Sequence, residues 1–228
     1  MTLPSRDAPH NWLFAGLADR LAEEGDHLTI DLPGLSVTIQ NFRGELAGFL
    51  NVCSHRATRL RPRGCGKGHL RCPYHGWTYN SRGVPIGIPE NEALFGLSRE
   101  DKEKLALKSV EVEACGSFVF LRVASGGPPL KDHLGRLAGE LEARSLTAAD
   151  RVSAKEGMAG GSWAFPEGGL EVPPNLRLQE AEGWTLLTAC TRLATDRSLL
   201  SLELFRSGGA SADLPAALAR QWEAASLS

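Results

Sequence analysis

The chain has 228 residues, of which 42% are hydrophobic and 23% charged, the composition of a globular protein with one good core and room for an appendage. No run of about 18 apolar residues could span a bilayer, and the amino terminus lacks the apolar stretch of a signal peptide. We therefore expect a cytoplasmic protein without a membrane segment. Its five cysteines are an odd number, which argues against a disulfide framework.

Short strand-like segments dominate the first half of the chain. Residues 12–23 have apolar side chains at helical spacing, but the segments that follow are brief and are broken by turn residues, as at 43–45 and 80–83. Many short strands between turns predict an antiparallel β-sandwich. The predicted strands cover residues 28–31, 36–42, 46–52, 69–72, 77–79, 107–113 and 117–123.

The second half has a more mixed pattern, with five glycines and three prolines in residues 157–174 that predict a loop. We expect a mostly β fold with a domain over residues 1–128 and a small α+β region over 129–228. The elements expected in that region are a helix over 130–144, a hairpin of 184–193 with 197–206, and a helix over 214–227 with Ser211 or Asp213 as its N-cap. Trp163, Phe165 and Trp184 are interpreted as core residues, and a small-molecule pocket near them is the alternative.

Two metal-binding half-sites are the most informative feature of the chain. Cys53-x-His55 and Cys72-x-x-His75 each contain one cysteine and one histidine, and both lie where a turn is predicted. Two thiolates on one iron and two imidazoles on the other are the ligand set of a Rieske [2Fe–2S] centre. A zinc site is the alternative, but zinc motifs usually pair cysteine with cysteine and histidine with histidine. Cys65 and His69, between the half-sites, are interpreted as structural.

The net charge of −2 hides a strongly basic segment around these half-sites. Between Glu45 and Glu90 there is no acidic residue, whereas seven basic residues give a formal charge of +7. Because this segment surrounds a candidate redox centre, we expect it to attract an acidic electron-carrying protein and not nucleic acid; a solvated arginine-rich loop is the alternative. The residues predicted to form this docking patch are Arg56, Arg59, Arg61, Arg63, Lys67 and Arg71.

Residues 51–56 and 71–77 resemble the N-terminal Rieske domain of the α subunits of ring-hydroxylating oxygenases, and the resemblance covers about residues 8–135. Rieske proteins of quinol-oxidising membrane complexes are less similar, because they have an extra cysteine in each half-site. One departure is Ala57, where the oxygenase family usually has glycine.

This resemblance implies a role for each motif residue. Cys53 and Cys72 would bind the inner iron, and His55 and His75 the outer, solvent-proximal iron. His75 would lie on the route by which electrons leave. Tyr74 and Trp77 would pack beside the cluster and keep it dry.

The α subunits of that family also contain a catalytic domain, in which two histidines and a carboxylate hold a mononuclear ferrous ion. In this chain the last 95 residues contain no histidine, since His133 is the last one. We therefore expect a [2Fe–2S] cluster but no mononuclear iron, and a C-terminal region that resembles a vestigial catalytic domain. Such a chain would not hydroxylate a substrate by itself.

Three functions follow as hypotheses. The first is an α-like accessory subunit in an oligomer, which takes electrons from a reductase or ferredoxin and passes them to an intact oxygenase α subunit. The second is a free ferredoxin-like carrier between a reductase and an oxygenase. The third is a non-enzymatic redox sensor or assembly protein.

The ligand assignment can be tested at His75. Replacing His75 with Cys should leave a cluster in place and lower its reduction potential, because thiolate is a more electron-rich ligand than imidazole. Potentiometric titration followed by EPR measures the potential, and iron and sulfide analysis checks that the cluster is retained. An unchanged potential would contradict the assignment.

Overall fold

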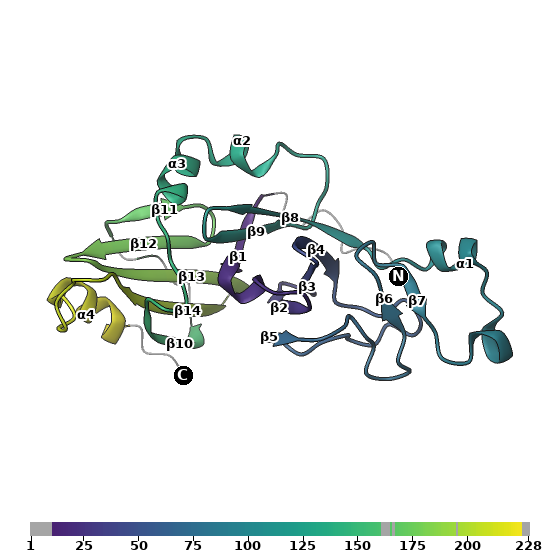
Figure 1. Cartoon of the computed structure of the whole chain (residues 1–228). Coiled ribbons are helices and arrows are strands. Elements are labelled where there is room, and N and C mark those ends of the chain that lie inside the picture. Colours follow the sequence, from purple (N-terminus) through teal and green to yellow (C-terminus); the bar gives the residue numbers. More distant parts are fainter. Residues whose placement is uncertain (1–10, 161–164, 166, 195, 225–228) are drawn as a thin grey trace.

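The computed structural model describes residues 11–160, 165, 167–194 and 196–224. Two antiparallel sheets lie beside each other along the length of the molecule, and a two-stranded ribbon lies at one end (Figure 1). The predicted mostly β, antiparallel fold class is therefore confirmed. None of the described helices is long and apolar enough to cross a membrane.

The first sheet has seven strands, and hairpins with tight turns build most of it. Arg43 and Gly44 join β3 to β4, and both have positive φ (56° and 93°), as a two-residue hairpin turn requires. The predicted strands of this half are present with slightly different ends, except that residues 69–72 form only an isolated bridge at Arg71. In sheet order the strands are β1 (Leu13–Leu17), β9 (Phe118–Arg122), β8 (Ser109–Cys115), β4 (Glu45–Leu50), β3 (Leu35–Phe42), β2 (Asp26–Leu32) and β5 (Gly64–Lys67).

The helix expected over residues 12–23 is wrong. Residues 13–17 instead form β1 at the edge of the first sheet, and only a 3-10 turn, η1 (Ala18–Leu21), follows. Gly16 lets β1 approach its neighbours closely, since a Cβ there would lie 2.6 Å from Leu28. Pairing with β9 thus prevails over the helical spacing of the apolar residues.

The second sheet has five strands, of which the last four are joined in sequence by hairpins, while the first strand in sequence pairs with the last. The predicted hairpin of 184–193 with 197–206 is confirmed, but the loop expected over 157–174 is wrong at both ends. Its first residues continue β10, where Gly157 and Gly160 lie opposite residues of β14, so sheet pairing outweighs their low strand propensity. The strands are β10 (Arg151–Gly160), β14 (Arg197–Arg206), β13 (Trp184–Ala194), β12 (Leu176–Ala181) and β11 (Leu170–Val172).

Helices are short and lie at the margins of the sheets (Figure 1). The helix expected over 130–144 is split at Gly135, whose φ of 54° breaks it into α2 (Leu130–Leu134) and α3 (Arg136–Glu142). The C-terminal helix α4 (Ala216–Ala224) begins two residues later than predicted, and the end predicted at residue 227 lies outside the described residues. The remaining elements are the ribbon strands β6 (Thr78–Tyr79) and β7 (Pro85–Gly87), the π-helical turn η2 (Asn91–Phe95) and α1 (Arg99–Lys104).

The two large sheets share one hydrophobic core. Phe14 and Phe120 of the first sheet belong to the same buried cluster as Leu187 and Phe205 of the second. At the sheet edge, the side chain of Asn175 accepts a hydrogen bond from the backbone N–H of Phe14 and donates one to its carbonyl, both at 2.9 Å. The outward-facing backbone groups of an edge strand are thereby satisfied across the junction.

A buried group of charges also crosses this junction. Glu203 of β14, 3% exposed, pairs with Arg20 at 2.7 Å and with Arg151 at 2.6 Å. Arg151 also reaches Asp19 of η1 at 3.3 Å. Because a buried carboxylate is costly without partners, these contacts fix the position of η1 against the second sheet.

Replacing Asn175 with Ala should lower the free energy of unfolding by about 2–4 kcal/mol, because two buried backbone groups of Phe14 would lose their partners. Urea denaturation followed by fluorescence measures the loss. Ser207→Ala, which removes one exposed hydrogen bond, serves as the control and should change stability by less than about 0.5 kcal/mol. Equal effects of the two changes would contradict the bridging role of Asn175.

Candidate metal centre

The two half-sites lie in loops that are built in the same way. In the first loop, the backbone N–H of Cys53 donates to the carbonyl of Thr58 at 2.8 Å, and the N–H of Ala57 donates to the carbonyl of Cys53 at 2.9 Å. In the second loop the same two bonds recur at the same spacing from Cys72, at 2.8 and 3.0 Å. Each loop is therefore a closed turn that fixes its cysteine at the start and its histidine within the bend.

Each turn contains one residue in the left-handed region, four positions after the cysteine. Gly76 has φ of 72°, and a Cβ on it would come within 2.9 Å of the guanidinium of Arg71. Ala57 holds the same place in the first loop with φ of 55°. A non-glycine residue there costs about 1 kcal/mol, so the departure at Ala57 is a local strain that the closed turn tolerates.

The cysteines point inward and the histidines outward. Cys53 and Cys72 are each 2% exposed and belong to a buried cluster with Leu60, Leu70 and Trp77. The two thiols are neighbours, since Cys72 adds to the effect of burial in raising the pKa of the Cys53 thiol.

His55 and His75 are partly exposed, and their ring centroids lie 4.8 Å apart. The structure thus brings all four predicted ligands together, with sulfur on the inside and nitrogen toward the surface. They come from loops that lie between β4 and β6 in sequence.

The donor set suits a [2Fe–2S] cluster. Nδ1 of His55 is buried and has no hydrogen-bond partner among the described residues, as expected of a nitrogen whose partner is a metal. Burial, the neighbouring His75 and Arg56 lower the pKa of His55, so its imidazole is kept in the neutral form that binds a metal. Among the described residues no three His, Cys, Asp or Glu side chains converge on one point, and a [2Fe–2S] centre asks for only two protein ligands per iron.

Burial raises the pKa of the Cys53 thiol, while hydrogen bonds from Tyr79 and from the backbone of His55 lower it. When bound, the cluster supplies one-electron redox chemistry, and the residues around the sulfur set its potential.

Tyr79 is a residue of the site that sequence analysis missed. Its hydroxyl lies 3.0 Å from Sγ of Cys53 and 3.2 Å from Oγ of Ser54, and it accepts a hydrogen bond from the backbone N–H of Ser54 at 3.3 Å. Burial and the neighbouring Cys53 raise the pKa of Tyr79, so the hydroxyl keeps its proton. Its position two residues after Trp77, on the same side of a strand, is the sequence signal that could have indicated it.

Aromatic rings cover the two histidines. Trp77, 3% exposed, stacks on His55 with an interplanar angle of 3°, as the predicted packing role requires. Phe95 of η2 contacts the rings of His55 and Trp77 edge-on, and no sequence pattern indicated this contact. The packing role predicted for Tyr74 needs correction, since its ring is 62% exposed and covers the face of His75 at the surface instead of sealing the centre.

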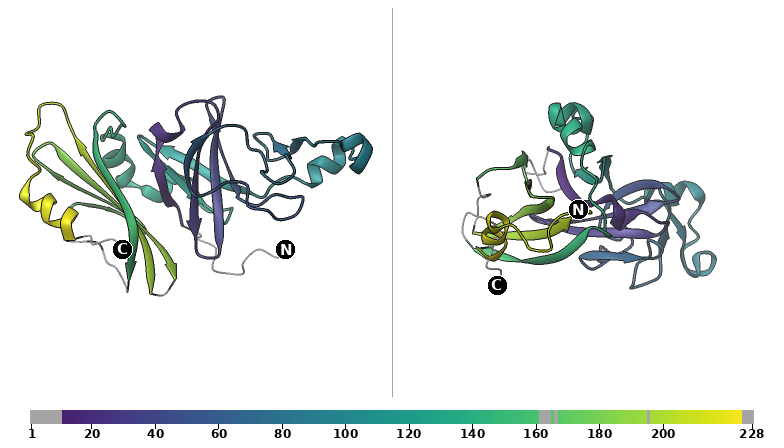
Figure 2. Two further views of the ribbon diagram at one scale, coloured as in Figure 1. Left: turned by 90° about the horizontal axis from the view of Figure 1, so that it is seen from below. Right: turned by 60° about the vertical axis from the view of Figure 1, so that its left-hand side comes forward.

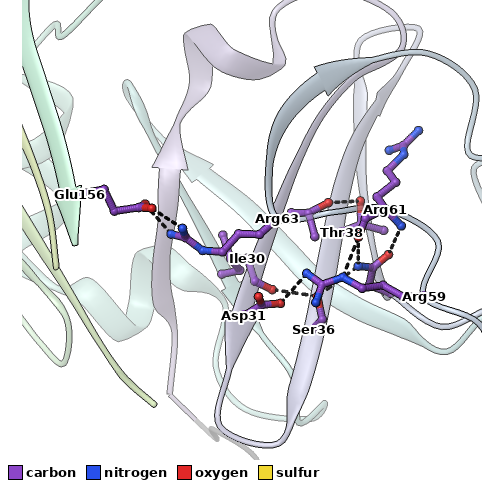
Figure 3. A network of polar contacts seen from close by, with 10 residues as sticks. Ile30, Asp31, Ser36, Thr38, Arg59, Arg61, Arg63 and Glu156 are labelled. Atoms are coloured by element: carbon purple, nitrogen blue, oxygen red, sulfur yellow. Dashed lines mark hydrogen bonds and ion pairs between the residues drawn. The ribbon is translucent and has the colours of Figure 1, made fainter. Parts of the chain in front are cut away.

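Three of the six residues in the predicted basic docking patch are neutralised by acids from distant parts of the sequence. Arg59 pairs with Asp31 at 2.7 Å, and Arg63 forms a bidentate ion pair with Glu156 of β10 (Figure 3). Lys67 pairs with Glu23.

Arg61 is 6% exposed and cannot be a surface docking residue, so that assignment is wrong. Among the described residues, only Arg56 and Arg71 of the six are exposed without a carboxylate partner.

The other residues singled out in the sequence lie away from the centre. Cys65 is exposed in β5, and His69 is exposed before the second half-site. Trp184 is 4% exposed and donates to the carbonyl of Ser211 at 3.1 Å, which supports its interpretation as core. Trp163 lies outside the described residues.

Comparison with known proteins agrees with this site. The family model for the Rieske [2Fe–2S] domain matches residues 11–110. The chain is 36% identical over 137 residues to the large oxygenase component of the naphthalene 1,2-dioxygenase system of Pseudomonas putida. It is 30% identical over 135 residues to the alpha subunit of the N,N-dimethyl phenylurea N-demethylase of Sphingobium sp. (strain YBL2). Each match covers 58% of this chain, which spans only 30% and 29% of these two relatives.

Solved structures match over more of the chain. Naphthalene 1,2-dioxygenase from Rhodococcus sp. bound to indole superimposes with a TM-score of 0.72 at 17% identity, covering 89% of this chain and 69% of that one. The quaternary ammonium Rieske monooxygenase CntA, in complex with the inhibitor MMV12, gives 0.68 at 16% identity, covering 94% and 74%. Because these shares exceed the Rieske region, the shared fold includes the second sheet.

Residues 11–110 are therefore a Rieske [2Fe–2S] domain. The relatives that share it are alpha or large oxygenase subunits of Rieske oxygenase systems.

Replacing Tyr79 with Phe should lower the reduction potential by about 40 mV, because a hydrogen bond to a ligand sulfur stabilises the electron-rich reduced state by about 1 kcal/mol. Potentiometric titration of the protein with its cluster measures the shift. Tyr74→Phe is the matched control, since it removes an exposed hydroxyl but keeps the ring over His75. A shift of the same size in Tyr74→Phe would show that the hydroxyl of Tyr79 has no special role.

Proposed function

We propose that this chain is an electron-transfer protein of the Rieske oxygenase type, which receives electrons from a reductase or ferredoxin and passes them to an oxygenase subunit on another chain. In this proposal Cys53, His55, Cys72 and His75 bind the cluster, and electrons leave through His75. The oxygen-activating iron belongs to the other chain, so this chain acts as an accessory subunit.

The observation that carries the proposal is the position of the candidate centre in the molecule. The ribbon of β6 and β7, which follows the second half-site, lies with α1 at one end, and the second sheet lies at the other (Figure 1, Figure 2). The loops that contain the two histidines therefore lie toward the end of the molecule that is away from the second sheet. An electron that leaves through them would enter another molecule.

The surface around the histidines has the character of a protein-binding site. Leu94 and Tyr74 are 67% and 62% exposed, and Phe95 is 40% exposed while its ring touches His55. We call these three residues the apolar collar. Large exposed apolar side chains that gather in one place indicate a site for a partner protein.

The second sheet supports an accessory role. Its fold is shared with Rieske oxygenases, yet the printed sequence has no histidine after His133, so the sheet offers no imidazole for a mononuclear iron. The relatives are named as subunits or components of larger systems. A chain that keeps this scaffold could join an assembly of intact subunits.

Co-expression with a full-length oxygenase α subunit from the same organism tests the proposal. The two chains should form a stable complex by light scattering at micromolar concentration, and the reduced protein should be reoxidised faster within it. Leu94→Asp places a charge in the apolar collar and should weaken the complex by roughly tenfold or more. Val152→Asp, at an exposed aliphatic residue of β10, is the matched control.

Each outcome separates the hypotheses. A protein that stays monomeric and is not reoxidised by the α subunit would refute the proposal. Rapid reoxidation without a stable complex would favour the free carrier instead.

A further inference from the structure

Arg61 is a buried cation without an anionic partner. Its side chain donates from Nη2 to Oε1 of Gln40 at 2.6 Å and to the carbonyl of Gly68 at 3.0 Å, while Nη1 is buried without any partner. No carboxylate in the part of the chain that the structure describes forms an ion pair with it, and burial lowers its pKa to about 10. It therefore keeps a full positive charge inside the domain at neutral pH.

Arg61 is also fixed between the two half-sites. Its backbone N–H donates to Oδ1 of Asn51 at 3.0 Å, and Nδ2 of Asn51 donates to the carbonyl of Arg61 at 2.7 Å. Asn51 is completely buried and stands two residues before Cys53. Gly68, which holds the guanidinium, stands four residues before Cys72.

The partners of the guanidinium belong to the same region of the domain as Tyr79. Gln40 and Gly68, these two partners, line the same open groove of about 900 Å³ as Tyr79, whose hydroxyl contacts Sγ of Cys53. Leu60, the residue before Arg61, packs in the buried cluster that contains both cysteines.

A buried charge is costly unless something of opposite sign compensates it. With two ferric ions, two sulfides and two thiolates, the oxidised cluster with its cysteines has no net charge. It gains one negative charge when it takes up one electron. A fixed cation nearby, in a medium of low dielectric, interacts with that charge only in the reduced state.

We infer that Arg61 is a positioning residue that holds the two half-site loops together and, through its uncompensated charge, favours the reduced state of the cluster. The inference rests on the proposed electron-transfer function, but it concerns the domain alone and needs no partner. Arg59, two residues away, cannot act in this way because Asp31 neutralises it at the surface.

The test is the midpoint potential of the protein with its cluster, titrated with dithionite at pH 8 and followed by EPR. Arg61→Met removes the charge and should lower the ratio of reduced to oxidised cluster at a fixed potential by roughly threefold to tenfold. Gln40→Glu keeps an acceptor oxygen beside Arg61 but adds a negative charge. It should therefore lower the ratio of reduced to oxidised cluster by a similar factor, while the hydrogen bonds that hold Arg61 stay in place. Because burial and Arg61 lower the pKa of His27, that nearby histidine is neutral at pH 8.

Two further variants separate charge from geometry. Arg61→Lys keeps the charge and should stay near the wild-type ratio. Arg82→Gln makes the same net charge change at an exposed ion pair with Glu103 and should shift the ratio much less.

If Arg61→Met does not retain its cluster, Gln40→Glu alone decides the question. Wild-type potentials in Gln40→Glu, or an equal fall in Arg61→Lys and Arg61→Met, would overturn the inference. Because no oxygenase is present, failure here leaves the accessory role intact, and failure of the accessory role leaves this result unchanged.

Discussion

The structure depends on a division between the inside and the outside of one pair of loops. Cys53 and Cys72 are closed into the hydrophobic cluster by matched backbone hydrogen bonds, whereas His55 and His75 stay at the surface. A redox centre held in this way changes charge where the protein is dry and exchanges electrons where it is accessible. Tyr79 acts on the dry side, because its hydroxyl contacts a thiol that solvent does not reach.

The arrangement of the two sheets places the candidate centre at one end of the molecule. They share a core, and the bridge from Asn175 to Phe14 and the charges around Glu203 join them into one body. Since the candidate centre lies at the far end of that body, the second sheet cannot fold back over the histidines without breaking these contacts (Figure 2). The same contacts that stabilise the fold thus keep the second sheet away from the surface around His55 and His75.

Local features of the site could be predicted from the sequence, and features that depend on distant residues could not. The half-site spacing and the hairpins follow from short-range rules, so the two matched loops that hold the four predicted ligands and the turn at Gly44 could be anticipated from the sequence. The prediction of a helix over 12–23 was wrong because the strand that pairs with this segment, β9, lies about 100 residues away in the sequence. Phe95 was missed because its contact with His55 comes from a separate turn.

The basic segment shows why counting charges along a sequence gives an incomplete picture of electrostatics. Most of its formal charge is cancelled by acids such as Glu156 that lie far away in the chain. What remains acts in two separate ways. Arg56 and Arg71 are exposed beside the histidines and can only orient a partner, with an effect that salt screens. Arg61 is hidden from salt and solvent, so its charge acts on the centre itself, and one buried cation matters more to the cluster than several exposed ones.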